Sequence, residues 1–295
     1  MLLRHIRYFL AVAEHRNFTR AAEALFVSQP TLSQQIRQLE EGLGAELFDR
    51  GGRQLRLTDA GEAYREYARR ALRELEAGRR ALHDVASLRS GELRLAMTPT
   101  FTAWLAGPLL AGFHARHPGI ALNVREMSQE AMEAGLADDA LDIGIAFAPA
   151  RTLDVEAEPW LEEELALVAG EGHPAALAAR ALSAADLAAL PLALLSADFV
   201  TRGHIDDYCL RHGVRPRVAM EVNSIGAAVE IIRHGVLAGI LPSAAAFSQP
   251  GLRRLSLLPP LPSRRAALLL KRDGYRSAAA RAFAGFARGF DPATG

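Results

Sequence analysis

A polar helix face that begins at Gln29 carries the side chains best suited to chemistry in this chain. Apolar residues recur at helical spacing on one side of the segment, at Leu32, Ile36, Leu39 and Leu43. Short hydrogen-bonding side chains lie on the opposite side, namely Gln29, Thr31, Ser33, Gln34 and Arg37. Side chains of these types read base edges in the major groove of DNA. The alternative is an ordinary solvated face, because Gln and Ser are common on protein surfaces.

Two shorter helical segments are expected to position this face. The first has an apolar side at Leu3, Ile6, Phe9, Leu10 and Ala13. The second contains Ala21 and Ala22, and Thr19 is its expected N-cap. Ser28 is expected to cap the polar helix, with Pro30 in its first turn. Because Ala21 and Ala22 are small, two helices joined by so short a turn can cross steeply, and the pattern predicts a helix-turn-helix.

A strand-turn-strand pattern follows the polar helix. Segments 47–50 and 54–57 flank a turn at 51–53 that contains two glycines, which predicts a wing. Arginines of the wing are expected to contact phosphates or a minor groove. The predicted DNA contacts of this winged helix-turn-helix, residues 1–58, are Thr19, Arg20, Ser28, Gln29, Pro30, Thr31, Ser33, Gln34, Arg37, Arg50, Arg53 and Arg56.

A long helix is expected to begin with a cap at Thr58 and to run to about Leu88. The predicted linker is 59–90. Its apolar stripe is Ala60, Tyr64, Tyr67, Ala71, Leu75, Gly78, Leu82 and Val85. About thirty residues at 1.5 Å each make a rod of roughly 45 Å. A single stripe on so long a rod predicts a dimer partner. Packing of the stripe against its own domain is the alternative.

Residues 91–295 alternate between strand and helix patterns, which predicts an α/β fold with parallel sheets covered on both faces. One helix is expected over 177–190. Hydroxyls of Thr100 and Thr102 stand at the start of the first helix of this region, where backbone N–H groups favour an anion. Ser128 and Gln129 begin the second helix at the same edge of the sheet. Each hydroxyl could also serve as an N-cap, and only their clustering favours a ligand site.

Composition and missing motifs exclude several classes of protein. The chain has 34 basic and 34 acidic residues, and the first ninety hold fifteen Arg against twelve acidic residues, an asymmetry too small to decide a partner. The single cysteine, Cys209, cannot form an internal disulfide. The sequence has no HExxH, GxSxG, Walker or GxGxxG motif, so we expect no enzyme, metal site or cofactor. Frequent charges near the N-terminus predict a cytoplasmic protein without a membrane span.

Several segments together resemble the LysR-type transcriptional regulators, and the resemblance covers the whole chain. The segments that carry it are 3–13, 18–25, 27–36, 47–50 and 57–61. The resemblance implies a winged helix-turn-helix, a linker helix, and a two-lobed, doubly wound effector domain like periplasmic binding proteins. Lobe I would hold about 91–163 and 266–295, and lobe II about 164–265. It also implies a homotetramer built as a dimer of dimers, promoter DNA and RNA polymerase as partners, and an effector between the lobes.

Segments 97–102, 126–130, 142–149 and 194–197 resemble the cyanate-responsive activators within the family. This implies cyanate, a small monoanion, as the effector. A small carboxylate remains an alternative, as does a small-molecule-binding protein that does not bind DNA. The predicted effector contacts are Thr98, Thr100, Phe101, Thr102, Ser128, Gln129, Phe147, Ser196, Phe199, Thr201 and Asn223.

Overall fold

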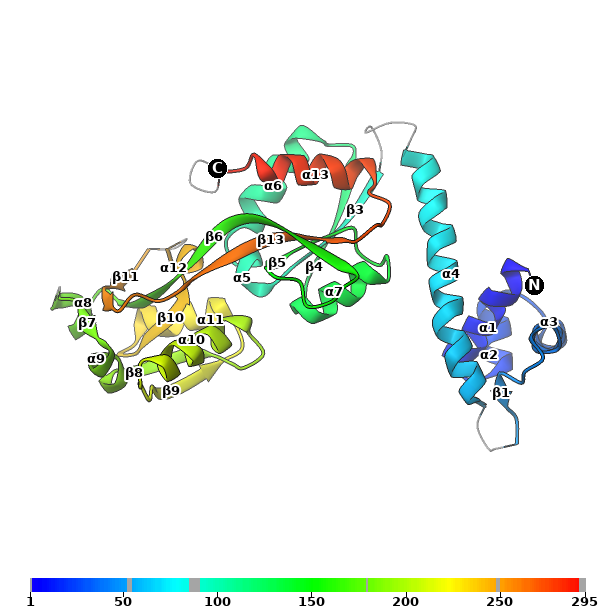
Figure 1. The fold of residues 1–295 in the computed structure, drawn as a ribbon, viewed down its shortest axis with the longest axis horizontal. Helices are drawn as coiled ribbons and strands as arrows, with labels where there is room; N and C mark the ends of the chain where they lie inside the picture. The colour runs from blue at the N-terminus through cyan, green and yellow to red at the C-terminus, as the bar shows by residue number, and fades with distance from the viewer. Residues whose placement is uncertain (1, 52–54, 85–90, 179, 248–249, 292–295) are drawn as a thin grey trace. The chain divides into compact units, whose positions relative to one another are not determined.

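The computed structural model describes residues 2–51, 55–84, 91–178, 180–247 and 250–291. The chain divides into two compact units, Met1–His83 and Asp84–Gly295, which we describe separately (Figure 1). The division falls at the far end of the long helix, so this helix belongs with the first unit. In the part of the chain that the structure describes, no helix is both long and apolar enough to cross a membrane.

Four helices and a two-stranded hairpin make up the first unit. They are α1 (Leu3–His15), α2 (Phe18–Ala24), α3 (Gln29–Leu43), β1 (Phe48–Asp49), β2 (Arg56–Leu57) and α4 (Asp59–Asp84). The side chains of Ala21 and Ala22 are buried in a core shared by the first three helices, as expected for a close helix crossing. β1 and β2 pair antiparallel, with Phe48 opposite Leu57. Residues 52–54 at the tip of the predicted wing, including Arg53, lie outside the described residues.

The helix caps decide where α2 and α3 begin. The predicted N-cap at Thr19 is wrong, because Asn17 caps α2 and its side-chain oxygen accepts hydrogen bonds from the N–H groups of Thr19 and Arg20 at 2.8 and 3.0 Å. Asn17 is extended and stands directly before the helix, whereas Thr19 already lies in its first turn. The predicted cap at Ser28 is confirmed, since its hydroxyl accepts from Thr31 N, and the predicted place of Pro30 in the first turn is confirmed too.

Helix α4 has an inner and an outer apolar row. Tyr64, Ala68 and Leu72 pack against the core of the first unit. Tyr67 and Leu75 are 69% and 55% exposed. The prediction of one stripe therefore merged two rows, and Tyr64 belongs to the inner one. The outer row has no apolar partner among the described residues of its own unit, and the predicted last turn of the helix, 85–88, lies outside them.

The second unit consists of two lobes built on one mixed sheet of nine strands. Lobe I contains β3 (Gly91–Met97), α5 (Pro99–Thr102), α6 (Ala106–Arg116), β4 (Ile120–Glu126), α7 (Gln129–Ala137), β5 (Ile143–Phe147) and α13 (Ala278–Arg288). Lobe II contains α8 (Pro174–Leu177), β7 (Leu182–Ser183), α9 (Ala184–Ala189), β8 (Pro191–Leu195), α10 (Val200–Arg211), β9 (Arg217–Val222), α11 (Ile225–His234), β10 (Ala238–Pro242), α12 (Ser243–Phe247), β11 (Leu252–Leu255) and β12 (Leu257–Leu258).

Two long strands connect the lobes. β6 (Val155–Gly170) pairs antiparallel with β13 (Ser263–Lys271) in its first half and with β10 in its second half. Figure 1 shows both strands running from one lobe to the other. The strands around β3 and β8 are parallel, as expected. β6 and β13 meet antiparallel, a pairing that the prediction of parallel sheets did not include, because the chain passes from lobe I to lobe II along β6 and returns along β13.

Each lobe has apolar residues on both faces of its sheet. In lobe I, helices α6 and α13 cover one face and α7 covers the other. In lobe II, α10 covers one face and α11 the other. The predicted helix over 177–190 is wrong, since α8, β7 and α9 occupy this region. Ser183 and Asp186 form a capping box that begins a new helix, and residue 179 lies outside the described residues.

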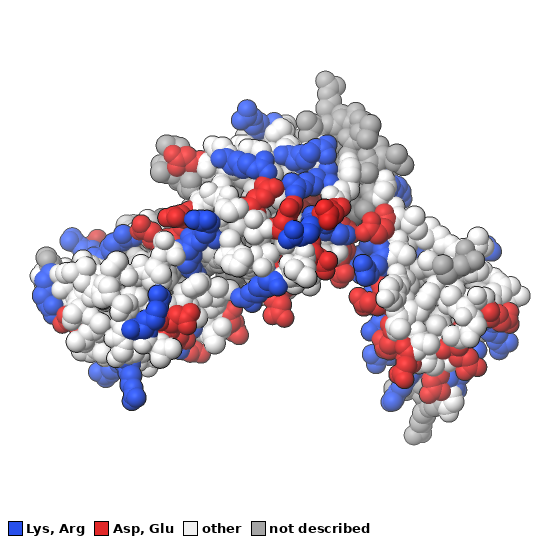
Figure 2. All heavy atoms as spheres, viewed as in Figure 1, with Lys and Arg blue, Asp and Glu red and all other residues white. Residues whose placement is uncertain are grey.

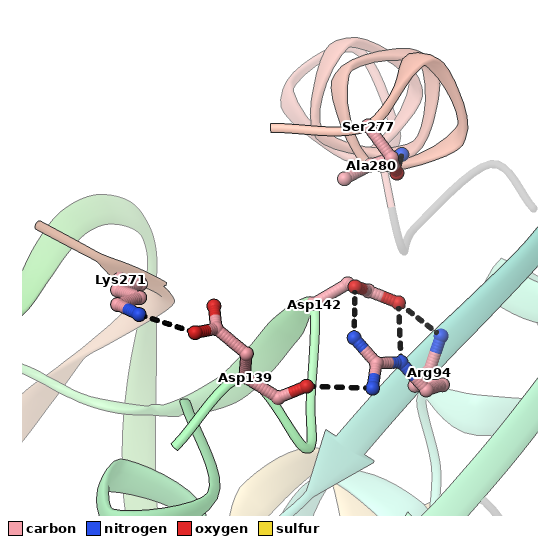
Figure 3. A network of polar contacts seen from close by, with 6 residues as sticks. All are labelled: Arg94, Asp139, Asp142, Lys271, Ser277 and Ala280. Atoms are coloured by element: carbon pink, nitrogen blue, oxygen red, sulfur yellow. Dashed lines mark hydrogen bonds and ion pairs between the residues drawn. The ribbon is translucent and has the colours of Figure 1, made fainter. Parts of the chain in front are cut away.

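A polar network holds the loop that leads into β5. Arg94 of β3 binds the Asp142 carboxylate through Nη2 at 2.7 Å and Nε at 3.1 Å, and it donates to the Asp139 carbonyl at 2.6 Å (Figure 3). Lys271 of β13 pairs with the Asp139 carboxylate. Asp142 bonding raises the pKa of Arg94, although burial opposes this shift. The network lies before the amino end of β5 and therefore supports the fold at the edge away from the predicted ligand residues.

Candidate nucleic-acid interface and ligand cavity

The polar face of α3 is exposed to solvent. Its side chains are exposed at Gln29, Pro30, Thr31, Gln34 and Arg37, and Ser33 is half-buried. The Ser28 hydroxyl lies 2.7 Å from that of Thr31, so these two are paired at the amino end of the helix. The side chains of Thr19 and Arg20 are exposed in the first turn of α2. These placements leave Gln34 and Arg37 available to a partner that approaches the helix.

Glu40 ties α3 to the hairpin. Its buried carboxylate accepts hydrogen bonds from Leu47 N at 2.9 Å and Phe48 N at 3.3 Å, and it pairs with Arg50 Nη2 at 2.5 Å. The Arg50 guanidinium also lies 5.9 Å from the centre of the Phe18 ring. Arg50 thus holds α3 against the hairpin, a role that the sequence pattern did not predict. Arg56 is exposed on β2.

Another contact that the sequence analysis missed joins α1 to α3. His5 is buried, and its Nε2 atom lies 3.0 Å from Gln35 Oε1, while Gln35 Nε2 donates to Gln38 at 2.9 Å. The bond between His5 and Gln35 fixes α3 on its support, whereas the bond to Gln38 stays within α3. The visible face in Figure 2 shows basic and acidic side chains interspersed over this unit. This face therefore presents no field of one sign to a partner.

The second unit has a cavity of about 280 Å³ between its lobes. Its lining comprises Thr98, Pro99, Thr100, Glu126, Met127, Ser128, Gln129, Phe147, Asp198, Phe199, Val200 and Asn223. The structure thus brings together seven of the predicted effector contacts: Thr98, Thr100, Ser128, Gln129, Phe147, Phe199 and Asn223. Most of the lining lies at or next to the amino ends of α5, α7, α10 and α11.

The polar groups of this cavity differ in their freedom to bind a ligand. The Thr98 side chain is 5% exposed, and its hydroxyl has no hydrogen-bond partner among the described residues. The Ser128 hydroxyl accepts from Ala131 N and can still donate. The Gln129 amide is occupied, since Nε2 donates to Glu133 Oε1 and to the Phe147 carbonyl at 2.9 Å each. Gln129 therefore anchors the end of β5.

Four predicted effector contacts lie outside this cavity. Phe101 is fully buried in the core of lobe I, where its ring centre lies 5.0 Å from that of Phe147. The Thr102 hydroxyl donates to the Glu126 carboxylate and faces an adjoining cavity of about 550 Å³. The Ser196 hydroxyl donates to Asp198 at 3.3 Å. Thr201 is buried and accepts a hydrogen bond from Arg264 Nη1 at 3.0 Å.

Phe199 is the shared wall of the cleft. Its side chain lines the 280 Å³ cavity, the 550 Å³ cavity and a third cavity of about 610 Å³. Two carboxylates, those of Glu126 and Asp198, also line the central cavity, and its described lining includes no Lys or Arg. The central cavity therefore offers an anion hydroxyl donors and helix amino ends in place of a cationic side chain.

Comparison with known proteins assigns both units to one family. Residues 3–62 match the bacterial regulatory helix-turn-helix protein, lysR family, and residues 86–291 match the LysR substrate binding domain. The chain belongs to the LysR family. It is a DNA-binding transcriptional regulator, and the proteins it resembles are regulators, not enzymes. The predicted family, fold class and absence of enzymatic function are confirmed.

Individual LysR relatives are similar over nearly the full chain. A probable hydrogen peroxide-inducible genes activator of Mycobacterium avium is 35% identical, over 95% of this chain and 91% of its own length. A RuBisCO operon transcriptional regulator of Allochromatium vinosum is 34% identical, over 96% of this chain and 94% of its own length. Full-length CbnR, solved with its target DNA, has a TM-score of 0.68 at 25% identity, covering 98% of this chain and 99% of CbnR.

A buried ion pair crosses the two connecting strands of the LysR substrate-binding domain. Glu163 of β6 and Arg264 of β13 are paired in the sheet register, form a salt bridge, and have side chains only 2% exposed. The Arg264 guanidinium also lies 4.1 Å from the centre of the Phe147 ring. It therefore touches Phe147 of lobe I and Thr201 of lobe II at once. The sequence analysis did not single out either charge.

Burial dominates the electrostatics of this pair. It raises the pKa of the Glu163 carboxyl and lowers the pKa of the Arg264 guanidinium, although each partner's charge opposes the shift in the other. Glu163 Oε1 and Arg264 Nε have no hydrogen-bond partner among the described residues. Burial of the pair therefore costs desolvation free energy, and the fold tolerates this cost only while both charges are present.

Proposed function

We propose that this LysR regulator activates transcription in response to a small, singly charged anion bound in the 280 Å³ cavity. The observation that carries the proposal is the convergence of the amino ends of α7, α10 and α11 on one cavity that is also lined by Thr98, whose buried hydroxyl has no partner among the described residues. Helix amino ends present unpaired N–H groups and a partial positive charge. A ligand that accepts hydrogen bonds there would lie in the partial positive charge of these helix ends.

The two carboxylates in the lining limit the charge of this ligand. Glu126 is engaged by the Thr102 hydroxyl, but Asp198 and Glu126 together still oppose a second negative charge. A monoanion can be held by hydroxyls and backbone N–H groups without a lysine or arginine. The proposed ligand class is therefore a monoanion and not a phosphate ester or a dicarboxylate.

Cyanate and a small carboxylate are the two candidate effectors. The resemblance of segments 97–102 and 142–149 to cyanate-responsive regulators supports cyanate. The volume supports a larger ligand, since one water molecule occupies about 30 Å³ in the liquid and cyanate has only three atoms. Cyanate would bind together with water or after closure of the cleft, whereas a small carboxylate would fill the cavity as it stands.

We do not propose a peroxide response, although one relative is named for it. A switch that closes an internal disulfide needs two cysteines, and this chain has one. Cys209 is buried, and burial raises the pKa of its thiol. The thiolate that reacts with peroxide is therefore disfavoured at this position.

Loss of the Thr98 hydroxyl should separate ligand binding from folding. Thr98→Val keeps the side-chain shape and removes a buried hydroxyl that lacks a partner, so the melting temperature without ligand should stay equal or rise. Affinity for the effector should fall about tenfold, because a hydrogen bond to an anion is lost. Calorimetric titration with cyanate and with acetate, and melting curves, measure both effects.

Ser196→Ala is the control, because its hydroxyl is not part of the cavity lining and donates only at 3.3 Å to Asp198, which is part of it. Its affinity for the effector should equal that of the wild type. Wild-type affinity in Thr98→Val would place the ligand elsewhere. Binding of neither cyanate nor acetate by the wild-type protein would reject these two ligands.

DNA reading is proposed to lie with the exposed face of α3. Gln34→Ala should weaken binding to the promoter region upstream of the gene by about 5–150-fold, the range for 1–3 kcal/mol per base contact, while binding to unrelated DNA stays nearly constant. Gln38→Ala is the matched control, since Gln38 lies one turn further from the amino end and is bonded to Gln35. Fluorescence anisotropy at two salt concentrations provides the measurement. Equal losses on both DNAs would contradict base reading.

We further propose that the outer row of α4 pairs with a second copy of the chain. Tyr67 and Leu75 are large, apolar and exposed, and Ala71 and Gly78 continue the row at spacings of four and three. Such spacing suits contact between two helices. A dimer of dimers, as the family resemblance implies, and contact with RNA polymerase complete the proposed assembly.

The response itself is proposed to be a population shift. An effector that binds both walls of the cleft favours a closed arrangement of the lobes about β6 and β13. Closure would change the spacing of the DNA-binding units within the oligomer and relax bent promoter DNA. The coupling requires only that the ligand bind the closed arrangement more tightly than the open one.

A further inference from the structure

The turn between α2 and α3 carries an exposed phenyl ring. Phe26 is 96% exposed, more than any other large apolar side chain in the described part of the chain. Its neighbour Val27 is half-buried and packs against the core of the first unit. Val27 therefore fixes the turn, and the ring of Phe26 contributes nothing to that core.

The backbone of Phe26 adopts a conformation that favours glycine. Its φ is +55°, and it follows the C-cap Leu25 of α2. Phe26 N donates to the Glu23 carbonyl at 3.1 Å, and Val27 N donates to the Ala22 carbonyl at 3.0 Å. These two bonds define a Schellman motif, in which the residue at the position of Phe26 is usually glycine.

This chain uses glycine where α3 ends in a left-handed residue, at Gly44 with φ +67°. A phenylalanine in that conformation is strained, and an exposed phenyl ring costs solvation as well. Both costs favour replacement of Phe26, so the fold alone does not explain the residue. The exposed ring is therefore suited to use in binding a partner molecule.

The position of Phe26 identifies that use. The residue stands two positions before Ser28, the N-cap of α3, and thus beside the amino end of the helix that carries Gln29 and Gln34. In a helix-turn-helix, the amino end of the second helix contacts base edges. We propose that Phe26 is a specificity-determining residue that packs its ring against apolar atoms of the DNA, either a thymine methyl group or a deoxyribose. This inference rests on the proposed insertion of α3 in the major groove.

Phe26→Asn in the full-length chain provides the test, because asparagine tolerates a positive φ. The melting temperature of the variant should stay equal or rise, since strain and exposed apolar surface are both removed. Affinity for the promoter fragment should fall about tenfold. The slope of log affinity against log salt should not change, because no charge is lost. Phe26→Gly should give the same pattern and guards against an effect of the amide group.

A second arm separates the two apolar contacts. The wild-type protein and Phe26→Asn are compared on promoter DNA with thymine replaced by uracil. Loss of affinity in the wild type but not in the variant assigns the ring to a thymine methyl group. Equal affinity of the wild type on both DNAs, with a loss in the variant, assigns it to deoxyribose.

Wild-type promoter affinity in Phe26→Asn would overturn the inference. If transcription were lost at unchanged affinity, the ring would dock on a protein and not on DNA, which also rejects the proposal. Gln34→Ala distinguishes this failure from failure of the proposed function. A loss in Gln34→Ala alone would reject only the role of Phe26, whereas no loss in either variant would reject groove insertion by α3.

Discussion

Replacement of Arg264 by methionine is expected to lower the free energy of unfolding of the second unit by about 3–5 kcal/mol. The substitution leaves the Glu163 carboxylate without its partner in a site that is 2% exposed. Burial already raises the pKa of Glu163 while Arg264 is present, so the carboxylate alone would be still more costly. The hydrogen bond to Thr201 is lost as well.

The double variant Arg264→Met/Glu163→Leu is the matched control. Removal of both charges also removes the desolvation cost, so this variant should recover most of the lost stability. Urea unfolding of the full-length chain, followed by circular dichroism, gives the free energies. A single variant within 1 kcal/mol of the wild type would show that the pair is not buried in solution.

The same pair matters for the proposed response to effector. Arg264 contacts Phe147, which lines the ligand cavity, and Thr201, next to Val200 of the same lining. The two contacts lie in different lobes. A change in the separation of the lobes would therefore disturb a buried charge, which explains how ligand contacts could favour one discrete arrangement over another.

A methyl group added at Gly61 should disrupt the first unit. An alanine Cβ at this position would lie 2.0 Å from the Leu47 carbonyl oxygen and 3.0 Å from a methyl carbon of Leu57. The Leu47 carbonyl cannot move freely, because Thr58 N donates to it and Glu40 holds the N–H of the same residue. Gly61→Ala should cost about 3 kcal/mol or more, and promoter binding should be lost with the fold of the hairpin.

Gly42→Ala on α3 is the control in the same unit, since a Cβ there meets no atom within 4 Å. It should raise stability by about 0.5–1 kcal/mol, because alanine favours helix over glycine. Thermal unfolding and promoter binding of both variants provide the comparison. If Gly61→Ala melted at the wild-type temperature and bound the promoter normally, the close approach of α4 to the hairpin would be wrong.

Local patterns were sufficient to predict the elements that carry the DNA-binding function. Ser28, Pro30 and the apolar spacing of α3 act within a few residues, so the start and the buried side of this helix follow from the sequence. Two local predictions were wrong because a capping residue was misassigned or missed. Asn17 caps α2 in place of Thr19. The capping box at Ser183 begins a new helix within 177–190, a region that was predicted as one helix.

Wrong predictions about contacts between elements that are distant in the sequence had a different cause. The apolar positions of α4 could not be sorted into inner and outer rows until its packing on α1, where Tyr64 meets Phe9, was known. Parallel pairing was predicted for the repeated strand-helix units, and the antiparallel pairing of β6 with β13 was not foreseen, because it arises where the chain visits each lobe and returns. Periodicity reports which side of an element is buried and contains no information about which element covers it.

The sequence by itself determined the family, the helices of the first unit, and the edge of the sheet where a ligand is expected. Only the tertiary structure decided which of the predicted hydroxyls are available. Thr98 is left without a partner, Thr102 is taken by Glu126, 24 residues away, and Thr201 by Arg264, 63 residues away. The physical reason is that hydrogen bonds satisfy buried polar groups wherever packing brings a partner, and packing joins residues that no local spacing relates.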